Sequence, residues 1–158
     1  MPKPAYDLEK RIRKAMKSLP KLVAEEAAEY SRRRFAEKNF DGKPWKPLSK
    51  NYRPTRGTLL VRSGALLNSV RVVSASQEKV VIGAGNSKVK YARAHNEGFS
   101  GSVVVKSFRR IGKNGKIHTV RSHTRKMNIP QRQFMGHCGE LERLLKEEAE
   151  KLFKNVMK

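Results

Sequence analysis

Residues 59–98 read LLVRSGALLNSVRVVSASQEKVVIGAGNSKVKYARAHNEG and hold two runs rich in β-branched residues, 69–73 and 80–82. The short link between the runs contains polar turn-forming residues, so the two runs are predicted to pair as antiparallel strands. Residues 91–98 follow as one or two helical turns that end at Gly98, the usual place for a glycine after a helix. We expect the rest of the chain to cover these core strands and short helix, or to project from them.

Helical periodicity flanks this segment on both sides. Residues 7–39 carry apolar side chains at steps of three and four, a spacing that lines one face of a helix. Pro20 interrupts the run, so the pattern fits either one kinked helix or two helices that meet there. The apolar stripe keeps its phase across the proline, which favours a kink near residue 20. Residues 138–157 place Leu141, Leu145 and Leu152 on one face and predict a C-terminal helix.

Residues 100–126 predict a hairpin arm. Asn114-Gly115 lies between two apolar-bearing runs, and Asn-Gly is a strong short-range signal for a hairpin turn. The segment has no acidic residue, and its eight basic residues are Lys106, Arg109, Arg110, Lys113, Lys116, Arg121, Arg125 and Lys126. A hairpin with this much charge is not expected to pack flat on the body of the protein.

The charge of this basic arm has two interpretations. It can merely keep a solvated hairpin in solution, or it can dock the arm on a polyanionic or acidic surface. A field of a single sign costs self-repulsion, which favours docking and makes the eight cations candidate partner-binding residues. Aromatic residues that would stack on single-stranded nucleic acid are sparse, with only Phe99 and Phe108 nearby.

Length and composition set the outer bounds. At 158 residues the chain is expected to form a single domain, 1–158, and its apolar fraction of 37% predicts a thin core that partner subunits complete. The formal net charge of +22 predicts polyanionic partners. The one cysteine, Cys138, allows no intrachain disulfide. The sequence has neither a signal peptide nor an apolar run that could span a bilayer, so we expect a cytoplasmic protein with no membrane partner.

Catalytic and metal chemistry find little support in the sequence. The carboxylates outside the two helices are Asp41, Glu78 and Glu97, each in a turn-like context. The four histidines lack the paired spacings of zinc ligands. Residues 83–86, Gly-Ala-Gly-Asn, match neither the Rossmann nor the P-loop pattern and are interpreted as a turn. We therefore expect no catalytic residues, no metal and no cofactor.

Several short motifs, taken in order, resemble the phage virion morphogenesis (tail completion) family. They are Asp41-Gly42 with Pro44-Trp45, Arg62-Ser63-Gly64-Ala65-Leu66, Tyr91-Ala92 with Gly98, and Ile129-Pro130-Gln131-Arg132-Gln133-Phe134-Met135-Gly136. Their order and spacing together make the resemblance specific. The matching positions, read mostly as fold-defining, are Trp45, Gly64, Leu66, Tyr91, Gly98, Pro130, Arg132 and Phe134. The long basic arm is the main departure from the shared pattern.

The resemblance implies a structural, non-enzymatic virion component that completes or terminates a phage tail for head–tail joining and is assembled in the cytoplasm of the bacterial host. It implies a ring of identical subunits, a hexamer by the resemblance, whose partners are tail tube and head-connector proteins and DNA passing through the lumen. We expect one α+β domain, with an antiparallel sheet of about four strands packed by the two helices. The alternative function is a nucleic-acid-binding protein that uses the arm on phosphates.

Overall fold

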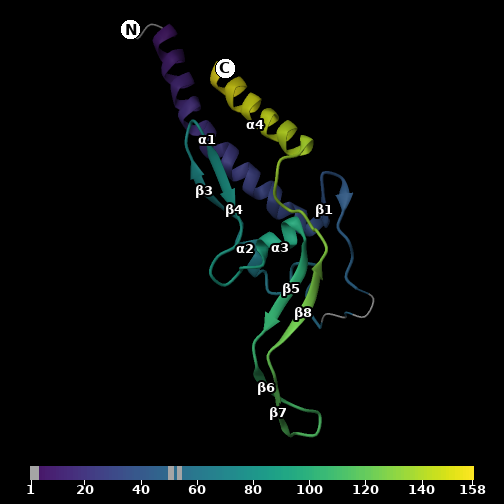
Figure 1. The fold of residues 1–158 in the computed structure, drawn as a ribbon. Helices are drawn as coiled ribbons and strands as arrows, with labels where there is room; N and C mark the ends of the chain where they lie inside the picture. The colour runs from purple at the N-terminus through teal and green to yellow at the C-terminus, as the bar shows by residue number, and fades with distance from the viewer. Residues whose placement is uncertain (1–3, 50–51, 53–54) are drawn as a thin grey trace.

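The structure is a computed structural model and describes residues 4–49, 52 and 55–158 (Figure 1). Its elements in chain order are α1 (Pro4–Glu37), β1 (Asn39–Phe40), β2 (Lys43–Pro44), α2 (Ala65–Asn68), β3 (Arg71–Ala75), β4 (Val80–Gly83), α3 (Ala92–Glu97), β5 (Phe99–Val105), β6 (Phe108–Ile111), β7 (Ile117–Val120), β8 (His123–Ile129) and α4 (Gly139–Met157). Long helices at both ends and short antiparallel strands between them confirm the predicted α+β class.

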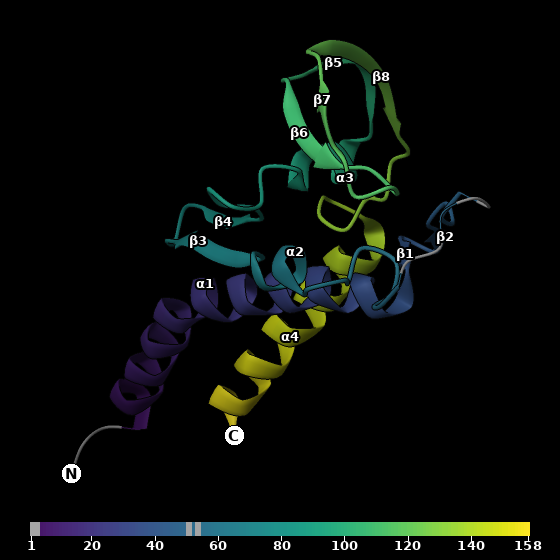
Figure 2. The same ribbon diagram turned by 90° about the horizontal axis from the view of Figure 1, so that it is seen from below.

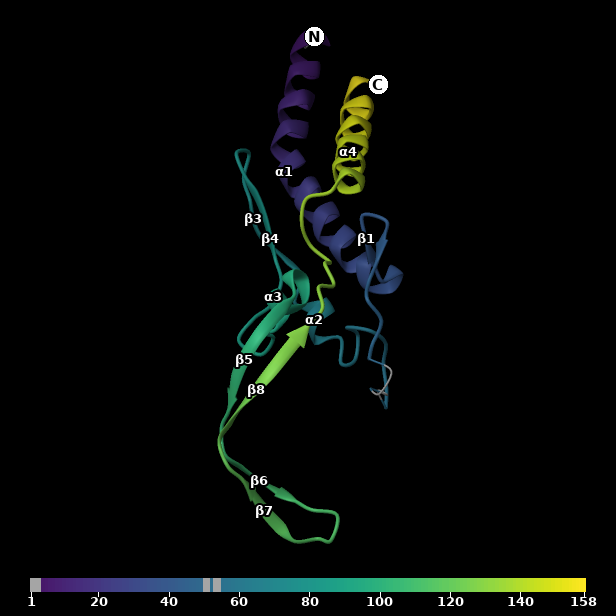
Figure 3. The same cartoon turned by 45° about the vertical axis from the view of Figure 1, so that its right-hand side comes forward.

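The two terminal helices form one side of the molecule. α1 and α4 lie side by side and run in opposite directions, so the start of α1 and the end of α4 lie at the same end (Figures 1 and 3). β3 and β4 lie along α1. The paired helices with this hairpin make up the body from which β5 to β8 extend.

α1 is a single helix that runs through Pro20, so the alternative of two separate helices does not apply. Figure 2 shows that α1 changes direction along its length, and an interior proline is a physical cause of such a bend because it removes a backbone hydrogen bond. The helix spans residues 4–37 rather than 7–39, since Lys38 has a φ of 56° and Asn39 begins β1. Met16, whose spacing places it on the predicted apolar face of this helix, is 54% exposed.

The expectation of one sheet of about four strands is wrong. The described residues form four separate two-stranded antiparallel sheets: β1–β2, β3–β4, β5–β8 and β6–β7. The physical reason is the direction of the hairpins. β3–β4 lies along α1, whereas β5 and β8 leave the body in another direction, so the edges of the two hairpins do not meet (Figure 3).

The core has Phe35 of α1 at its centre. Its ring packs edge-on against Trp45 at 5.7 Å between centroids and tilted against Phe134 at 4.9 Å. The buried residues of this cluster are Ala28, Phe35, Trp45, Leu66, Val70, Val89, Ala92 and Phe134. A second cluster between α1 and α4 contains Ala27, Tyr30, Phe40, Cys138 and Leu141. These clusters hold together four segments that are far apart in the sequence, 27–45, 66–70, 89–92 and 134–141.

Candidate functional site

The basic arm is a long hairpin that extends away from the body (Figure 3). β5 pairs with β8 from Phe99↔Ile129 to Val105↔His123, and β6 pairs with β7 from Phe108↔Val120 to Ile111↔Ile117. The tip closes through a hydrogen bond from Gly112 N to Lys116 O at 2.8 Å. The paired strands thus reach from 99 to 129, slightly beyond the predicted 100–126.

All eight basic residues predicted for partner binding are exposed; they are Lys106, Arg109, Arg110, Lys113, Lys116, Arg121, Arg125 and Lys126. They are spread along the arm rather than gathered at one point. The ion pairs found among the described residues all join side chains of α1, α3 or α4 and its leading His137. The arm therefore offers cations that the rest of the described chain does not neutralise.

Apolar side chains accompany these cations. Val104 is 70% exposed, and Ile111 and Ile117, which are cross-strand partners, are 74% and 69% exposed. Apolar groups are usually buried, and a two-stranded hairpin alone is only marginally stable in water. A surface that combines exposed apolar and basic groups is suited to contact with a partner that covers the apolar groups and neutralises the basic ones.

The base of the arm is fixed to the body by α3 and the returning chain. Gly98 ends α3 with a φ of 80°, which L side chains rarely adopt, and so redirects the chain into β5. Asn96 Oδ1 accepts hydrogen bonds from the backbone N–H groups of Phe134 and Met135, both at 3.0 Å. Asn96 was missed by sequence reasoning. The available signal was an asparagine inside a helix, where it is a poor helix former.

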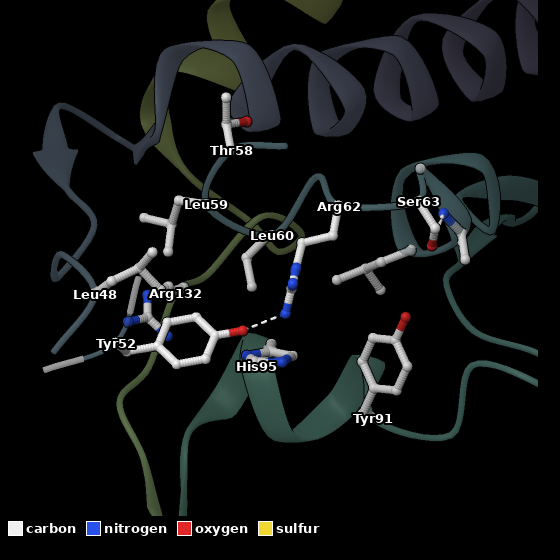
Figure 4. A pocket seen from close by; sticks show the side chains of 13 residues that line it. Leu48, Tyr52, Thr58, Leu59, Leu60, Arg62, Ser63, Tyr91, His95 and Arg132 are labelled. Atoms are coloured by element: carbon white, nitrogen blue, oxygen red, sulfur yellow. Dashed lines mark hydrogen bonds between the residues drawn. The ribbon is translucent and has the colours of Figure 1, made fainter. Parts of the chain in front are cut away.

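A pocket of about 390 Å³ lies beside the base of the arm (Figure 4). Its apolar wall includes Leu48, Leu59, Leu60 and Leu66. Tyr52 and Arg62 are hydrogen-bonded to each other at its rim. The pocket is completed by Tyr91, which directly precedes α3, by His95 of α3 and by Arg132 of the returning chain. Its lining therefore comes from three separate segments of the chain, which sequence reasoning did not bring together.

Arg132 is a buried cation, only 6% exposed. Its Nε donates to Lys46 O at 2.8 Å and its Nη2 donates to Pro47 O at 3.0 Å. Burial lowers the pKa of Arg132 below its ordinary value. The side chain thus fastens residues 46–47 to the arm base, and its remaining nitrogen Nη1 forms no hydrogen bond with the described residues.

His95 lies next to this guanidinium. Burial, with the charge of Arg132 as a second cause, lowers the pKa of His95 and favours its neutral form. Its Nδ1 is buried and has no hydrogen-bond partner among the described residues. The backbone O of His95 accepts from Arg132 N at 2.7 Å. The pocket therefore holds a buried cation and an unpaired polar atom close together.

The other motif residues lie in three places. Trp45 and Phe134 are buried in the core, and Trp45 Nε1 donates to Gln133 O at 2.6 Å. Gly64, with a φ of 75°, precedes α2 and lines the pocket together with Leu66, Tyr91 and Arg132. Pro130 is partly buried directly after β8. The predicted motif positions thus lie in the core, around the pocket and at the base of the arm.

The described residues contain no group of three or more histidine, cysteine, aspartate or glutamate side chains placed to hold a metal ion. Among them, too, no helix has the length and apolar character needed to cross a membrane.

Comparison with known proteins gives one match. The model of the phage virion morphogenesis family matches residues 6–154, nearly the whole chain. No curated protein matches the sequence. No solved structure matches the fold.

Proposed function

This chain belongs to the phage virion morphogenesis family, and we propose that it is the subunit of a ring that completes the phage tail for joining to the head. Membership gives the chain a structural role in the assembly of a phage particle. The ring, its place at the head-proximal end of the tail and its assembly in the host cytoplasm are the finer parts of the proposal.

Open strand edges support the ring. Each described sheet has only two strands, so each strand keeps one edge without a partner strand. Unpaired strand edges are templates for pairing with another chain, and joining identical subunits head to tail around a closed ring covers them. We propose a hexamer, with the thin core stabilised by contacts between subunits.

The projecting arm is the observation that carries the joining role. It places eight exposed cations and several exposed apolar side chains away from the body (Figure 3). In a ring, identical arms lie on one side or in the lumen. There they contact an acidic surface of the tail tube or head connector, or the DNA that passes through. Opposite charges steer such contacts and fix their orientation.

The experiment is electron microscopy of the purified protein, together with mass measurement over a concentration series. Closed rings of one stoichiometry are expected. Monomer alone at every concentration counts against a ring formed by the isolated protein.

A second measurement, on tails assembled without this protein, separates the two parts of the proposal. Adding the purified protein restores head joining if the tail-completion role is right, even where the free protein is monomeric.

A second candidate function, nucleic-acid binding, is favoured by the same exposed cations. It predicts binding to duplex DNA that weakens with salt at a log–log slope of about −0.9 per phosphate contact, or about −7 if all eight cations take part. Tight binding with this slope, lost when the arm lysines are replaced by glutamine, favours the second function. An absence of binding at low salt leaves the protein-docking role.

A further inference from the structure

We propose that the pocket beside the arm base binds a carboxylate together with an adjacent apolar side chain, both presented by a segment of another protein. Such a segment has the chemistry of an acidic peptide with a leucine-like residue. The site is separate from the cations of the arm and does not require the ring, so this inference goes beyond the function proposed above.

The first argument is a missing counter-charge. Arg132 is nearly fully buried, and the hydrogen bonds of its guanidinium go to two neutral carbonyls. No carboxylate pairs with it or with Arg62, although all 14 acidic residues of the chain lie within the described part. A buried charge without a partner is costly, and an incoming anion removes that cost.

The second argument is the chemistry of the wall. Four leucines line the pocket, and Tyr52 and Tyr91 flank it (Figure 4). A volume of about 390 Å³ accommodates one apolar side chain with the groups attached to it. A free phosphate ion satisfies Arg132 but leaves the leucines uncovered, so the wall favours an amphipathic ligand over an inorganic anion.

The third argument is the arrangement of donors. Arg132 Nη1 has no hydrogen bond with the described residues, and Nδ1 of the neighbouring His95 is buried without one. Figure 4 shows the Arg62 guanidinium, bound to the Tyr52 hydroxyl, directed toward His95. Arg62, His95 and Arg132 all line this pocket, and a carboxylate, which offers two oxygens, is an acceptor suited to the two guanidinium groups.

The test uses N-acetyl-L-leucine as the probe and N-acetyl-L-leucinamide as its neutral analogue. Binding is followed by NMR through the ring proton shifts of His95, with probe concentrations up to about 50 mM, the range in which so small a ligand binds. We expect saturable shifts with the carboxylate and at least tenfold weaker binding of the amide. Inorganic phosphate, as a second comparison, is expected to bind at least tenfold more weakly than N-acetyl-L-leucine.

Two variants keep the test independent of folding. Arg62→Gln removes one rim cation from an exposed position, and Ala65→Leu fills part of the pocket from a half-buried position on α2. Each is expected to weaken N-acetyl-L-leucine binding severalfold while the circular dichroism spectrum stays unchanged. Arg56→Gln, an exposed cation that does not line the pocket, is the matched control and is expected to bind like the natural protein.

Three results overturn the proposal: no saturable shift of His95, equal binding of the acid and the amide, or unchanged binding by both pocket variants. Phosphate binding as tight as that of N-acetyl-L-leucine overturns the apolar part and leaves a simple anion site. None of these results bears on whether the protein forms rings or completes tails, so failure here and failure of the proposed function are distinguishable.

Discussion

Arg34 of α1 and Glu140 of α4 are joined across the helix pair, with Arg34 Nη1 donating to Glu140 Oε2 at 3.1 Å. The same carboxylate oxygen accepts the hydroxyl of Tyr30 at 2.8 Å. The Arg34 guanidinium also lies 4.1 Å from the centre of the Tyr30 ring. Burial, with hydrogen bonds to Cys138 and Glu140, raises the pKa of Tyr30, so its hydroxyl stays protonated and acts as a donor. α4 is therefore held to α1 by a polar network as well as by apolar packing.

Removing Glu140 is expected to destabilise the protein. Glu140→Ala leaves the buried Arg34 without one of its partners, at a cost of about 1–3 kcal/mol in the free energy of unfolding. The loss is not larger, because Arg34 keeps its contact with Glu37 at 3.0 Å. Glu150→Ala, which breaks only an exposed pair with Lys154, is the control and is expected to cost under about 1 kcal/mol. Equal urea midpoints for the two variants contradict this account.

Trp45 joins the segment after β2 to the returning chain, so its substitutions test that link. Trp45→Phe keeps most of the aromatic packing but leaves Gln133 O without its donor, at an expected cost of about 1–3 kcal/mol. Trp45→Ala also opens a cavity beside Phe35 and is expected to cost about 3–5 kcal/mol. Urea unfolding followed by circular dichroism measures both. A Phe variant as unstable as the Ala variant would assign the whole effect to the lost hydrogen bond.

Gly98 and Gly115 allow a matched test of backbone strain. Both have positive φ, 80° and 74°. A Cβ added at Gly98 lies 3.2 Å from Gln131 N, whereas one at Gly115 has nothing within 4 Å. Gly98→Ala is therefore expected to cost about 1–3 kcal/mol and to loosen the arm base. Gly115→Ala carries only the strain of its backbone angle and is expected to cost less in thermal unfolding. If Gly115→Ala destabilised the protein more than Gly98→Ala, the arm base would not be held rigidly by the contact at Gln131.

His95 makes stability depend on pH. Its pKa is lowered from the ordinary value of 6.5 by burial and by Arg132, so the unfolded chain binds a proton more readily than the folded one. The stabilisation is fully present above pH 6.5, and it decreases as the pH falls below 6.5 toward the folded-state pKa. We expect His95→Asn to flatten this part of the curve of unfolding free energy against pH. An unchanged slope between pH 6.5 and pH 5 would be inconsistent with a buried, neutral His95.

Arm charge is expected to affect binding without supporting the fold. One variant replaces by glutamine the four arm lysines, Lys106, Lys113, Lys116 and Lys126. A matched variant replaces four exposed body lysines, Lys10, Lys14, Lys17 and Lys43. Neither is expected to lower the melting temperature, since removing like charges relieves repulsion. The arm variant is expected to elute from a heparin column at lower salt than the body variant. Equal elution would mean that binding follows net charge alone.

Patterns within short segments allowed much of the fold to be predicted. Asn114-Gly115 indicated the hairpin tip because a tight turn depends on local backbone conformation. Gly98 indicated the end of α3 for the same reason. These signals involve residues that are neighbours in the sequence. The arrangement of the hairpins depends instead on tertiary packing, which is why the expected sheet of about four strands does not form.

The pocket was beyond sequence reasoning for a related reason. Arg132 contacts the backbone of Lys46 and Pro47, which lie 86 and 85 residues away in the sequence. The sequence around Arg132 does not predict that it contacts these two residues. Met16 shows that sequence spacing alone does not determine burial. Its spacing fits the packed face of α1, but the described structure provides little to cover it at that point.

The α1–α4 pairing also determines when the body can be completed during synthesis. Tyr30 contacts Cys138, which the ribosome adds 108 residues later. Until α4 emerges, the apolar face of α1 around Ala27 and Tyr30 lacks its cover, although every hairpin has already been made. A nascent chain stalled before residue 138 leaves that face exposed, so the body of the protein is complete only after α4 has been made.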